Sequence, residues 1–220
     1  LGAGAAVRLS GKPIDLPALI IAQVFGLLIQ LYIVYANDYA DREDDVRNAT
    51  YNIFSGGSRV IPEGKLSPRE LLRGVYLVVA ANLVLCLSVA LFYDRMVMPL
   101  ILFVSVGLLW LYSFPPVRLS YRGGGELLQV AGVGLVLPLA GWYLQDGHLA
   151  GFPWGWFLFI IPLEIAAALA TTLPDEPADR ACGKMTAAAR FEALPVKSAI
   201  MVFNAAGLGL FLGAEVMAFG

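Results

Sequence analysis

The stretch that decides the fold reads Asn37-Asp38-Tyr39-Ala40-Asp41-Arg42-Glu43-Asp44-Asp45. It follows directly on an apolar run, residues 16–36, which is long enough to cross a bilayer as a helix. If the helix continues, Asp38, Asp41 and Asp45 share one face, because they stand at i, i+3 and i+7. Carboxylates crowded onto one face repel one another and favour a cation between them. Mg²⁺ prefers carboxylate ligands completed by substrate phosphates, so the stretch indicates a Mg²⁺ site, with a solvated helix end as the alternative.

The composition is that of a membrane protein. Of the 220 residues, 59% are hydrophobic and 15% are charged, and the mean hydropathy is +0.73. We therefore expect an all-α fold, a polytopic transmembrane helical bundle with about six complete spans. The net charge of −2 indicates no nucleic-acid partner. The predicted spans are residues 16–36, 75–93, 97–113, 127–144, 154–173 and 198–219.

Positive charge is concentrated in alternate loops. Twelve of the fifteen Lys and Arg residues fall in the loops that follow the first, third and fifth predicted spans. Because basic residues are retained in cytoplasmic loops, we expect loops 37–74, 114–126 and 174–197 to be cytoplasmic. Apolar residues stand at both ends of the chain, so we interpret residues 1–220 as a single domain that is truncated at both ends.

A second acidic cluster, Asp175 and Asp179, follows the fifth span. By parity it lies on the same membrane face as the first cluster. Pro177 would break a helix that ran through the pair, but it fits the first turn of a new helix with Asp175 as its N-cap. Two acidic clusters on one face favour a site for a metal and a diphosphate over two unrelated helix ends.

Three basic residues stand where they could meet a phosphate. Arg59 follows the pair Gly56-Gly57, whose backbone amides can converge on an anion. Arg118 lies in a Pro- and Gly-rich loop, and Lys184 follows the second acidic cluster. Each residue also has a plainer interpretation, either a glycine turn with a surface arginine or a charge that only enforces topology.

These motifs resemble those of the UbiA-type intramembrane prenyltransferases. Asn37-Asp38-x-x-Asp41-x-x-x-Asp45 is similar to the first signature of that family, and Asp175-x-x-x-Asp179 is similar to the second. The stretches 55–59, 112–118 and 179–184 also resemble the family, most closely its dihydroxynaphthoate polyprenyltransferase branch. The resemblance covers the whole chain.

The resemblance implies a fold of nine transmembrane helices in the cell membrane, with both acidic motifs on the cytoplasmic side. It also implies Mg²⁺-dependent transfer of a prenyl group from a polyprenyl diphosphate to an aromatic acceptor, in menaquinone or related quinone biosynthesis. One carboxylate of the second cluster would assist deprotonation of the acceptor. The implied residues are Asp38, Asp41, Asp45, Asp175 and Asp179 for the metal, Asn37, Arg59, Arg118 and Lys184 for the diphosphate, and Asp175 and Asp179 for catalysis.

Glu164 is an ionisable residue inside the fifth predicted span. It stands eleven residues before Asp175, so three helical turns place both on nearly the same face, with Glu164 about 16 Å deeper. We expect it to point into the same cavity, beside the prenyl tail, as a protonated side chain that bonds a neighbouring helix. The alternative is a catalytic base.

Two other functions remain open from the sequence. A CDP-alcohol phosphotransferase also places Asp clusters on Mg²⁺, but its signature requires an Asp-Gly start and an Ala-Arg pair that are absent around Asp38 and Asp175. A divalent-cation transporter would carry polar residues along several spans, whereas spans 97–113 and 198–219 are almost wholly apolar. Cys86 and Cys182 are expected to be free thiols, because one lies in an apolar run and the other in a polar loop.

Overall fold

The structure is a computed structural model that describes residues 2–48 and 57–219, with backbone only from residue 214 onward. All regular elements in these residues are helices, which confirms the predicted all-α class. The elements are α1 (Gly2–Ser10), α2 (Leu16–Arg47), α3 (Pro68–Tyr93), α4 (Met98–Ser113), α5 (Leu119–Arg122), α6 (Gly125–Gln129), the π-helix η1 (Val130–Val136), α7 (Leu137–Asp146), the 3₁₀-helix η2 (Trp154–Trp156), α8 (Phe157–Thr172), α9 (Glu176–Cys182), α10 (Ala187–Phe191) and α11 (Ala193–Phe219).

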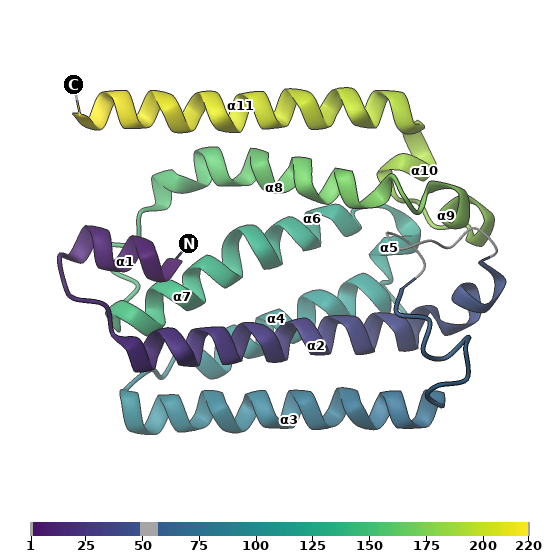
Figure 1. The fold of residues 1–220 in the computed structure, drawn as a ribbon, viewed down its shortest axis with the longest axis horizontal. Coiled ribbons are helices and arrows are strands. Elements are labelled where there is room, and N and C mark those ends of the chain that lie inside the picture. Colours follow the sequence, from purple (N-terminus) through teal and green to yellow (C-terminus); the bar gives the residue numbers. More distant parts are fainter. Residues whose placement is uncertain (1, 49–56, 220) are drawn as a thin grey trace.

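The long helices lie side by side in a bundle (Figure 1). Each of the six predicted spans corresponds to a helix or a continuous helical run. Five of these are long and apolar enough to cross a membrane within the described residues, and α4 is a shorter apolar helix. Side chains on their outer faces are exposed, as for Leu77 (70%), Phe92 (83%) and Phe103 (74%). Such a surface suits lipid rather than water.

The first predicted span continues as a helix through the whole acidic stretch. Helix α2 begins after Asp15, whose side chain accepts a hydrogen bond from the Ala18 N–H, and it ends at Arg47. Asp38 and Asp41 are buried on it, so these two acids face the protein interior. The condition under which Asp38, Asp41 and Asp45 share one face, a helix that continues past residue 36, is therefore met.

The fourth span is one helical run with a π-helical segment in its middle. Helix α6 passes at Gln129 into η1, which passes into α7. Pro138 has no N–H to donate, and the N–H of Leu137 bonds the carbonyl of Gly132, five residues back. The π segment therefore lies just before the proline, where the regular ladder loses a donor.

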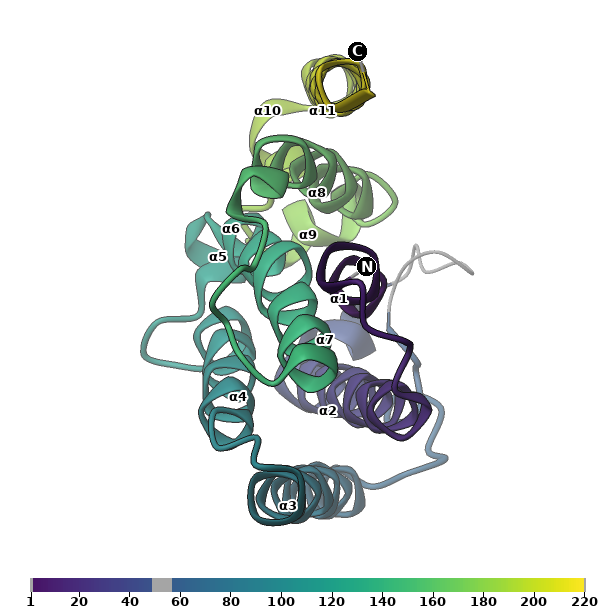
Figure 2. The same cartoon turned by 90° about the vertical axis from the view of Figure 1, so that its left-hand side faces the viewer.

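Figure 2 shows the bundle along its helices, with α3 at one edge and α11 at the other. The main core lies between α2, α3, α4 and α7, around side chains such as Phe25, Cys86, Met98 and Leu144. Asn82 is buried and its amide donates to the Phe25 carbonyl, so it joins α3 to α2. Cys86 and Cys182 are free thiols, as expected.

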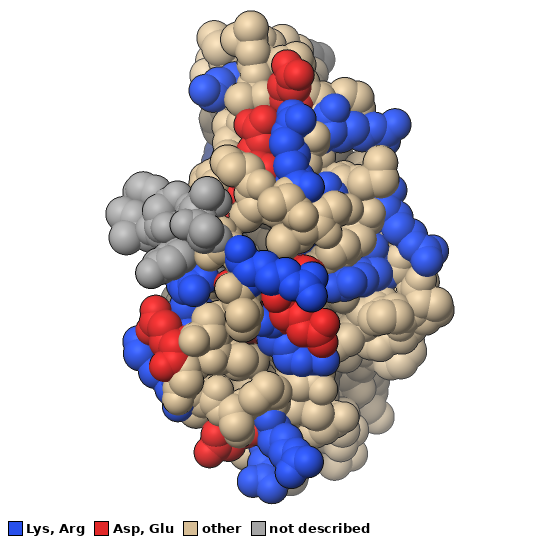
Figure 3. All heavy atoms as spheres, turned by 90° about the vertical axis from the view of Figure 1, so that its right-hand side faces the viewer, with Lys and Arg blue, Asp and Glu red and all other residues tan. Residues whose placement is uncertain are grey.

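The C-terminal ends of α2, α4 and α8 lie at one end of the bundle, together with α5, α9 and α10 (Figure 1). Figure 3 shows this end, where Lys and Arg side chains spread over the surface and alternate with acidic ones. The three basic loops thus meet at one end, as the alternation of charge predicted. The two acidic clusters are brought to this end as well.

Candidate active site

The two acidic clusters meet around two small polar cavities. The larger cavity has a volume of about 160 Å³, and Asn37, Asp41, Asp175, Asp179 and Lys184 are among its lining residues. The smaller, of about 70 Å³, is lined by these five residues and also by Asp44 and Asp45. Residues that stand more than a hundred positions apart in the sequence therefore share one polar space.

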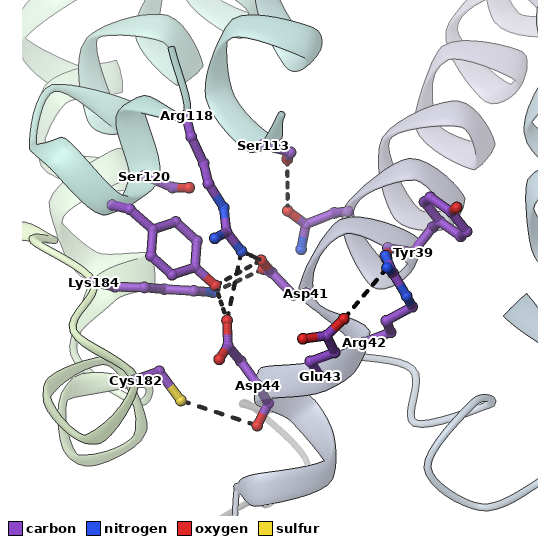
Figure 4. A network of polar contacts seen from close by, with 12 residues as sticks. Tyr39, Asp41, Arg42, Glu43, Asp44, Ser113, Arg118, Ser120, Cys182 and Lys184 are labelled. Carbon is purple, nitrogen blue, oxygen red and sulfur yellow. Dashed lines mark hydrogen bonds and ion pairs between the residues drawn. The ribbon is translucent and has the colours of Figure 1, made fainter. Parts of the chain in front are cut away.

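Asp41 has the densest set of contacts in this space (Figure 4). It is only 4% exposed, and its Oδ2 accepts a hydrogen bond from Lys184 Nζ at 2.7 Å. Its Oδ1 accepts from the Tyr121 hydroxyl at 3.1 Å and lies 3.7 Å from Arg118 Nη2. Buried carboxylates are stable when they are paired and hydrogen-bonded, and Asp41 meets both conditions.

Lys184 joins the two acidic clusters. Its Nζ also lies 4.0 Å from Asp179 Oδ1, so the same ammonium stands between the end of α2 and α9. Burial of Lys184 pulls its pKa down, but the charges of Asp41 and Asp179 outweigh burial and raise the pKa above its ordinary value. Lys184 is therefore charged at neutral pH.

Arg118, the N-cap of α5, and Tyr121 within α5 approach the first cluster from the segment that follows α4. Arg118 Nη2 lies 3.5 Å from Asp44 Oδ2, and its guanidinium stacks on the Tyr121 ring at 3.4 Å from the centroid. The Tyr121 hydroxyl lies within hydrogen-bonding distance of both Asp44 and Asp41, which share its single proton. Burial, followed by the charge of Asp41, raises the pKa of Tyr121, so its hydroxyl remains a donor.

Asp38 is held by Gly57 and Ser58, where the described part of the chain resumes after residue 48. The Ser58 hydroxyl donates to Asp38 Oδ2, and the Ser58 N–H donates to Oδ1 at 3.4 Å. Gly57 has φ +66°, and a Cβ there would lie 2.8 Å from Asp38 Oδ1, so glycine favours this close approach. Arg59 Nη1 donates to the Asp45 carbonyl at 3.1 Å. Residues 54–56 of the predicted glycine loop lie outside the described part.

The second cluster lies at the start of α9. Asp175 occupies the N-cap position with Pro177 in the first turn, as predicted, although its side chain makes no capping bond. Asp179 is 6% exposed, and its Oδ2 accepts from the Thr186 hydroxyl at 2.7 Å. Burial raises the pKa of Asp179 to about 6.

Asn37 lies at the boundary of this polar space. Its Oδ1 accepts from the Ser113 hydroxyl at 3.1 Å, and the residue lines both polar cavities. It also lines a third cavity, which is apolar, has a volume of about 630 Å³ and lies between α2, α4 and the α6–η1 run. Asn37, Tyr112, Gln129 and Thr171 line both the larger polar cavity and the apolar cavity. The polar and apolar spaces thus adjoin at these four residues.

The single helix that the prediction for Glu164 assumed does not reach Asp175 in the structure. Glu164 is not among the lining residues of the two polar cavities and the apolar cavity described above. It packs instead on η1, where a Cβ on Gly134 would lie 2.9 Å from Glu164 Cγ. The three-turn spacing was measured along one helix, and α8 ends at Thr172, before Asp175.

Four site residues were not among those predicted. Asp44 belongs to the acidic stretch, but it is not on the helix face that Asp38, Asp41 and Asp45 share. Tyr121 and Thr186 belong to no sequence motif, although each stands close to a predicted basic residue, Arg118 or Lys184. Glu126 stands in the glycine-rich loop of the sequence, and in the structure its carboxylate accepts a hydrogen bond from the Ala187 N–H at 2.7 Å and lines the larger polar cavity. Only the tertiary contacts single out these residues.

The acidic residues fit a hard cation that is held jointly with a phosphate ligand. Within residues 2–48 and 57–219, no three Asp, Glu, His or Cys side chains converge closely enough to hold a metal ion unaided. Mg²⁺ commonly binds through one or two carboxylates and completes its shell with water and substrate phosphates. The carboxylates of Asp41, Asp45, Asp175 and Asp179 line the polar cavities and suit that mode, whereas Asp38 lines the adjoining apolar cavity.

The fold and these cavities define a multi-pass membrane protein with a polar, acidic site next to an apolar cavity at one end of the bundle. The chain matches the UbiA prenyltransferase family over residues 2–220. No curated protein and no solved structure matches it. Since the match spans nearly all of the chain, the protein belongs to the UbiA prenyltransferase family.

Proposed function

We propose that the protein transfers a prenyl group from a polyprenyl diphosphate to an aromatic acceptor in the presence of Mg²⁺, in menaquinone or related quinone biosynthesis. The observation that carries the proposal is the contact between the acidic polar cavity and the apolar cavity at Asn37, Tyr112, Gln129 and Thr171. A prenyl diphosphate has the same two parts, a charged head and an apolar tail. Its reacting carbon would lie where the cavities meet.

The residues of this chain have distinct roles in the proposal. Asp38, Asp41 and Asp45 on one side and Asp175 and Asp179 on the other would hold the metal, which when bound would supply positive charge against the developing charge of the diphosphate. Basic and amide side chains bind the diphosphate oxygens directly, as charge-assisted donors in the case of the cations. These residues are Asn37, Arg59, Arg118 and Lys184.

The reaction separates charge in a site that must exclude water. The bond between the prenyl C1 and the diphosphate oxygen breaks, and its electron pair leaves with the diphosphate. A carbon of the acceptor ring then bonds to C1, and the ring regains aromaticity by losing a proton to Asp175 or Asp179. The apolar walls of α2, α4 and η1 shield the allylic cation from water until the ring attacks.

Product analysis tests this function. Purified protein is incubated with a prenyl diphosphate labelled at C1, Mg²⁺ and a panel of aromatic acceptors that includes a dihydroxynaphthoate and a hydroxybenzoate. We expect the label in one prenylated aromatic product, formed fastest with the dihydroxynaphthoate. Transfer of label to none of the acceptors would contradict the proposed function, and transfer to another ring would contradict only the branch.

We also propose that the protein resides in the cell membrane with both acidic clusters on the cytoplasmic side. The support is the gathering of the three basic loops at one end of the bundle, since such loops are retained in the cytoplasm. Cysteines introduced at Ser58 and His148 should react with an impermeant reagent from opposite sides of the membrane. Labelling from the same side would contradict the orientation.

A further inference from the structure

Asp41, the middle acid of the first cluster, has both carboxylate oxygens occupied by groups of the protein itself. Lys184 bonds Oδ2 at 2.7 Å, and Tyr121 bonds Oδ1 at 3.1 Å with Arg118 Nη2 at 3.7 Å from the same oxygen. Asp41 is 4% exposed and lines both polar cavities, so an ion that binds it from these cavities comes to lie beside these partners.

Lys184 is the partner that stands where a cation shared by both clusters belongs. Its Nζ lies within 4.0 Å of carboxylate oxygens from Asp41 and Asp179, which come from α2 and α9. The Lys184 side chain is 16% exposed, so screening by salt is weak there. A divalent ion placed beside this ammonium would be repelled by it.

We propose that Lys184 holds the place of the activating cation on Asp41 in the substrate-free protein and moves to the diphosphate when substrate binds, so that metal and diphosphate bind as a pair. The inference rests on the proposed function, because it takes a diphosphate as the ligand. Lys184 lines the larger polar cavity, and its flexible four-carbon stem lets the ammonium turn toward a phosphate oxygen. That movement leaves Asp41 Oδ2 open to the metal.

Arg118 is less suited to this movement. Its guanidinium lies on the Tyr121 ring at 3.4 Å from the centroid and is near both Asp41 and Asp44. The Lys184 ammonium is 5.3 Å from the same ring centroid and bonds Asp41 end-on. Arg118 is thus fixed by stacking, and Lys184 is the cation whose exchange controls access of the metal.

The exchange couples two binding events. A diphosphate that takes Lys184 raises the affinity of Asp41 for the metal, and by linkage the metal raises the affinity for the diphosphate by the same factor. Without the diphosphate, the metal has to bind Asp41 while the Lys184 ammonium is still paired with it. Without the metal, the diphosphate has to draw Lys184 away from Asp41 and leave that carboxylate without a cation. Each ligand alone should therefore bind weakly.

The wild-type protein provides the first test. Mn²⁺, which stands in for Mg²⁺ and is visible by electron paramagnetic resonance, is titrated into the chain in nanodiscs with and without saturating geranyl thiolodiphosphate. A protein-free titration corrects for the complex that the metal and the analogue form in solution. We expect the analogue to tighten metal binding by at least about tenfold. Equal metal affinity with and without bound analogue would overturn the inference.

Substitution of Lys184 provides a second test with effects of opposite sign. Lys184→Met removes the competitor of the metal and a ligand of the diphosphate. It should tighten binding of Mn²⁺ alone by about fivefold or more and weaken binding of the analogue by a similar factor. Lys184→Arg, which keeps the charge, should leave Mn²⁺ binding weak. Arg180→Met is the matched control, because Arg180 lies on α9 but pairs with Glu176, away from Asp41.

The outcomes separate this inference from the proposed function. Weaker binding of Mn²⁺ alone to Lys184→Met than to the wild-type chain would overturn the inference, because the lysine would then support the metal site. Should that variant fail to fold, Lys184→Gln replaces it in the titration of Mn²⁺ alone, with the same expected result. Absence of any binding of the analogue, with or without metal, would contradict the proposed function as well. Binding of the analogue without coupling to the metal would contradict only the inference.

Discussion

The polar cavities and the apolar cavity of this protein differ in how the chain builds them. The polar cavities combine residues from the end of α2, the loop after α4 and the region of α9, held by ion pairs and hydrogen bonds across the sequence. The apolar cavity is lined mainly by neighbouring helical turns of α2, α4 and the α6–η1 run. A change in the polar part should therefore affect binding of the charged head, and a change in the apolar part should affect selection of the tail.

The largest effect is expected from Asp41→Asn. The amide keeps the shape of the side chain but loses the charge that faces Lys184, and it can no longer bind the metal as a carboxylate. Activity should fall at least about a hundredfold, as for other groups that stabilise charge in a transition state. Rates of diphosphate release measure the loss, with Asp175→Asn as a second test of the other cluster.

A thermal unfolding profile serves as the control for Asp41→Asn, because breaking a buried ion pair is also destabilising. Near-normal rates in both Asp41→Asn and Asp175→Asn, in folded protein, would contradict a site made from the two clusters.

Gly132→Phe should impair the use of long prenyl tails without impairing binding of the charged diphosphate head. Gly132 lines the apolar cavity from η1, and a Cβ there would lie 3.8 Å from Leu108 Cδ1, so a phenyl ring would fill part of the tail space. We expect kcat/KM for long prenyl diphosphates to fall by about tenfold or more while geranyl diphosphate is used nearly as before.

The measurement for Gly132→Phe is a series of prenyl diphosphates of increasing length. Gly209→Phe is the control, since no atom beyond its own helix lies within 4 Å of a Cβ at that position on α11. A uniform loss across all chain lengths would argue that the apolar cavity does not hold the tail.

Tyr121→Phe should have a smaller effect on the polar part. The ring that supports Arg118 remains, but the hydroxyl bonds to Asp41 and Asp44 are lost. A hydrogen bond to a charged group contributes roughly 1.5–3 kcal/mol, so the KM for the prenyl diphosphate should rise by about tenfold with kcat changed less. Steady-state kinetics over a range of Mg²⁺ concentrations measures this, and an unchanged KM at limiting Mg²⁺ would contradict the role given to Tyr121.

The smallest effect is expected from Glu164→Gln. Glu164 packs on Gly134 and lies outside the three described cavities, so the variant should keep Mg²⁺ dependence and rates within about twofold of wild type. Glu164→Lys should disrupt assembly, because a long charged side chain cannot fit against η1. Turnover lost in folded Glu164→Gln, with binding of the diphosphate intact, would identify Glu164 as a catalytic base.

Features that depend on local sequence were predictable, and pairings between distant segments were not. The spans followed from apolar runs, and the spacing of Asp38, Asp41 and Asp45 indicated their shared face for the case that the helix continues, which the structure shows. The bond from Lys184 to Asp41 joins residues 143 positions apart, and that from Tyr121 to Asp44 joins residues 77 apart. Such pairs depend on how helices pack, for which one sequence carries no direct signal.

Glu164 shows that a spacing argument fails when it is carried past the end of a helix. Its predicted place assumed that one helix runs on to Asp175, whereas α8 ends at Thr172 and α9 begins after Asp175. The π segment was also unforeseen, although Pro138 is a local signal that the regular hydrogen-bond ladder is interrupted there. Residue spacing thus predicts which side chains share a face only within one continuous helix.

The central claim is that the acidic clusters act on the diphosphate of a substrate whose tail lies in the adjoining apolar cavity. The most direct measurement follows diphosphate release and prenylated product in the same reaction, with Mg²⁺ present or removed by a chelator. We predict one diphosphate released for each prenylated aromatic product, with both lost when Mg²⁺ is removed and restored when it is added back. Release of diphosphate without a prenylated product, or product formation that is unaffected by the chelator, would contradict the account.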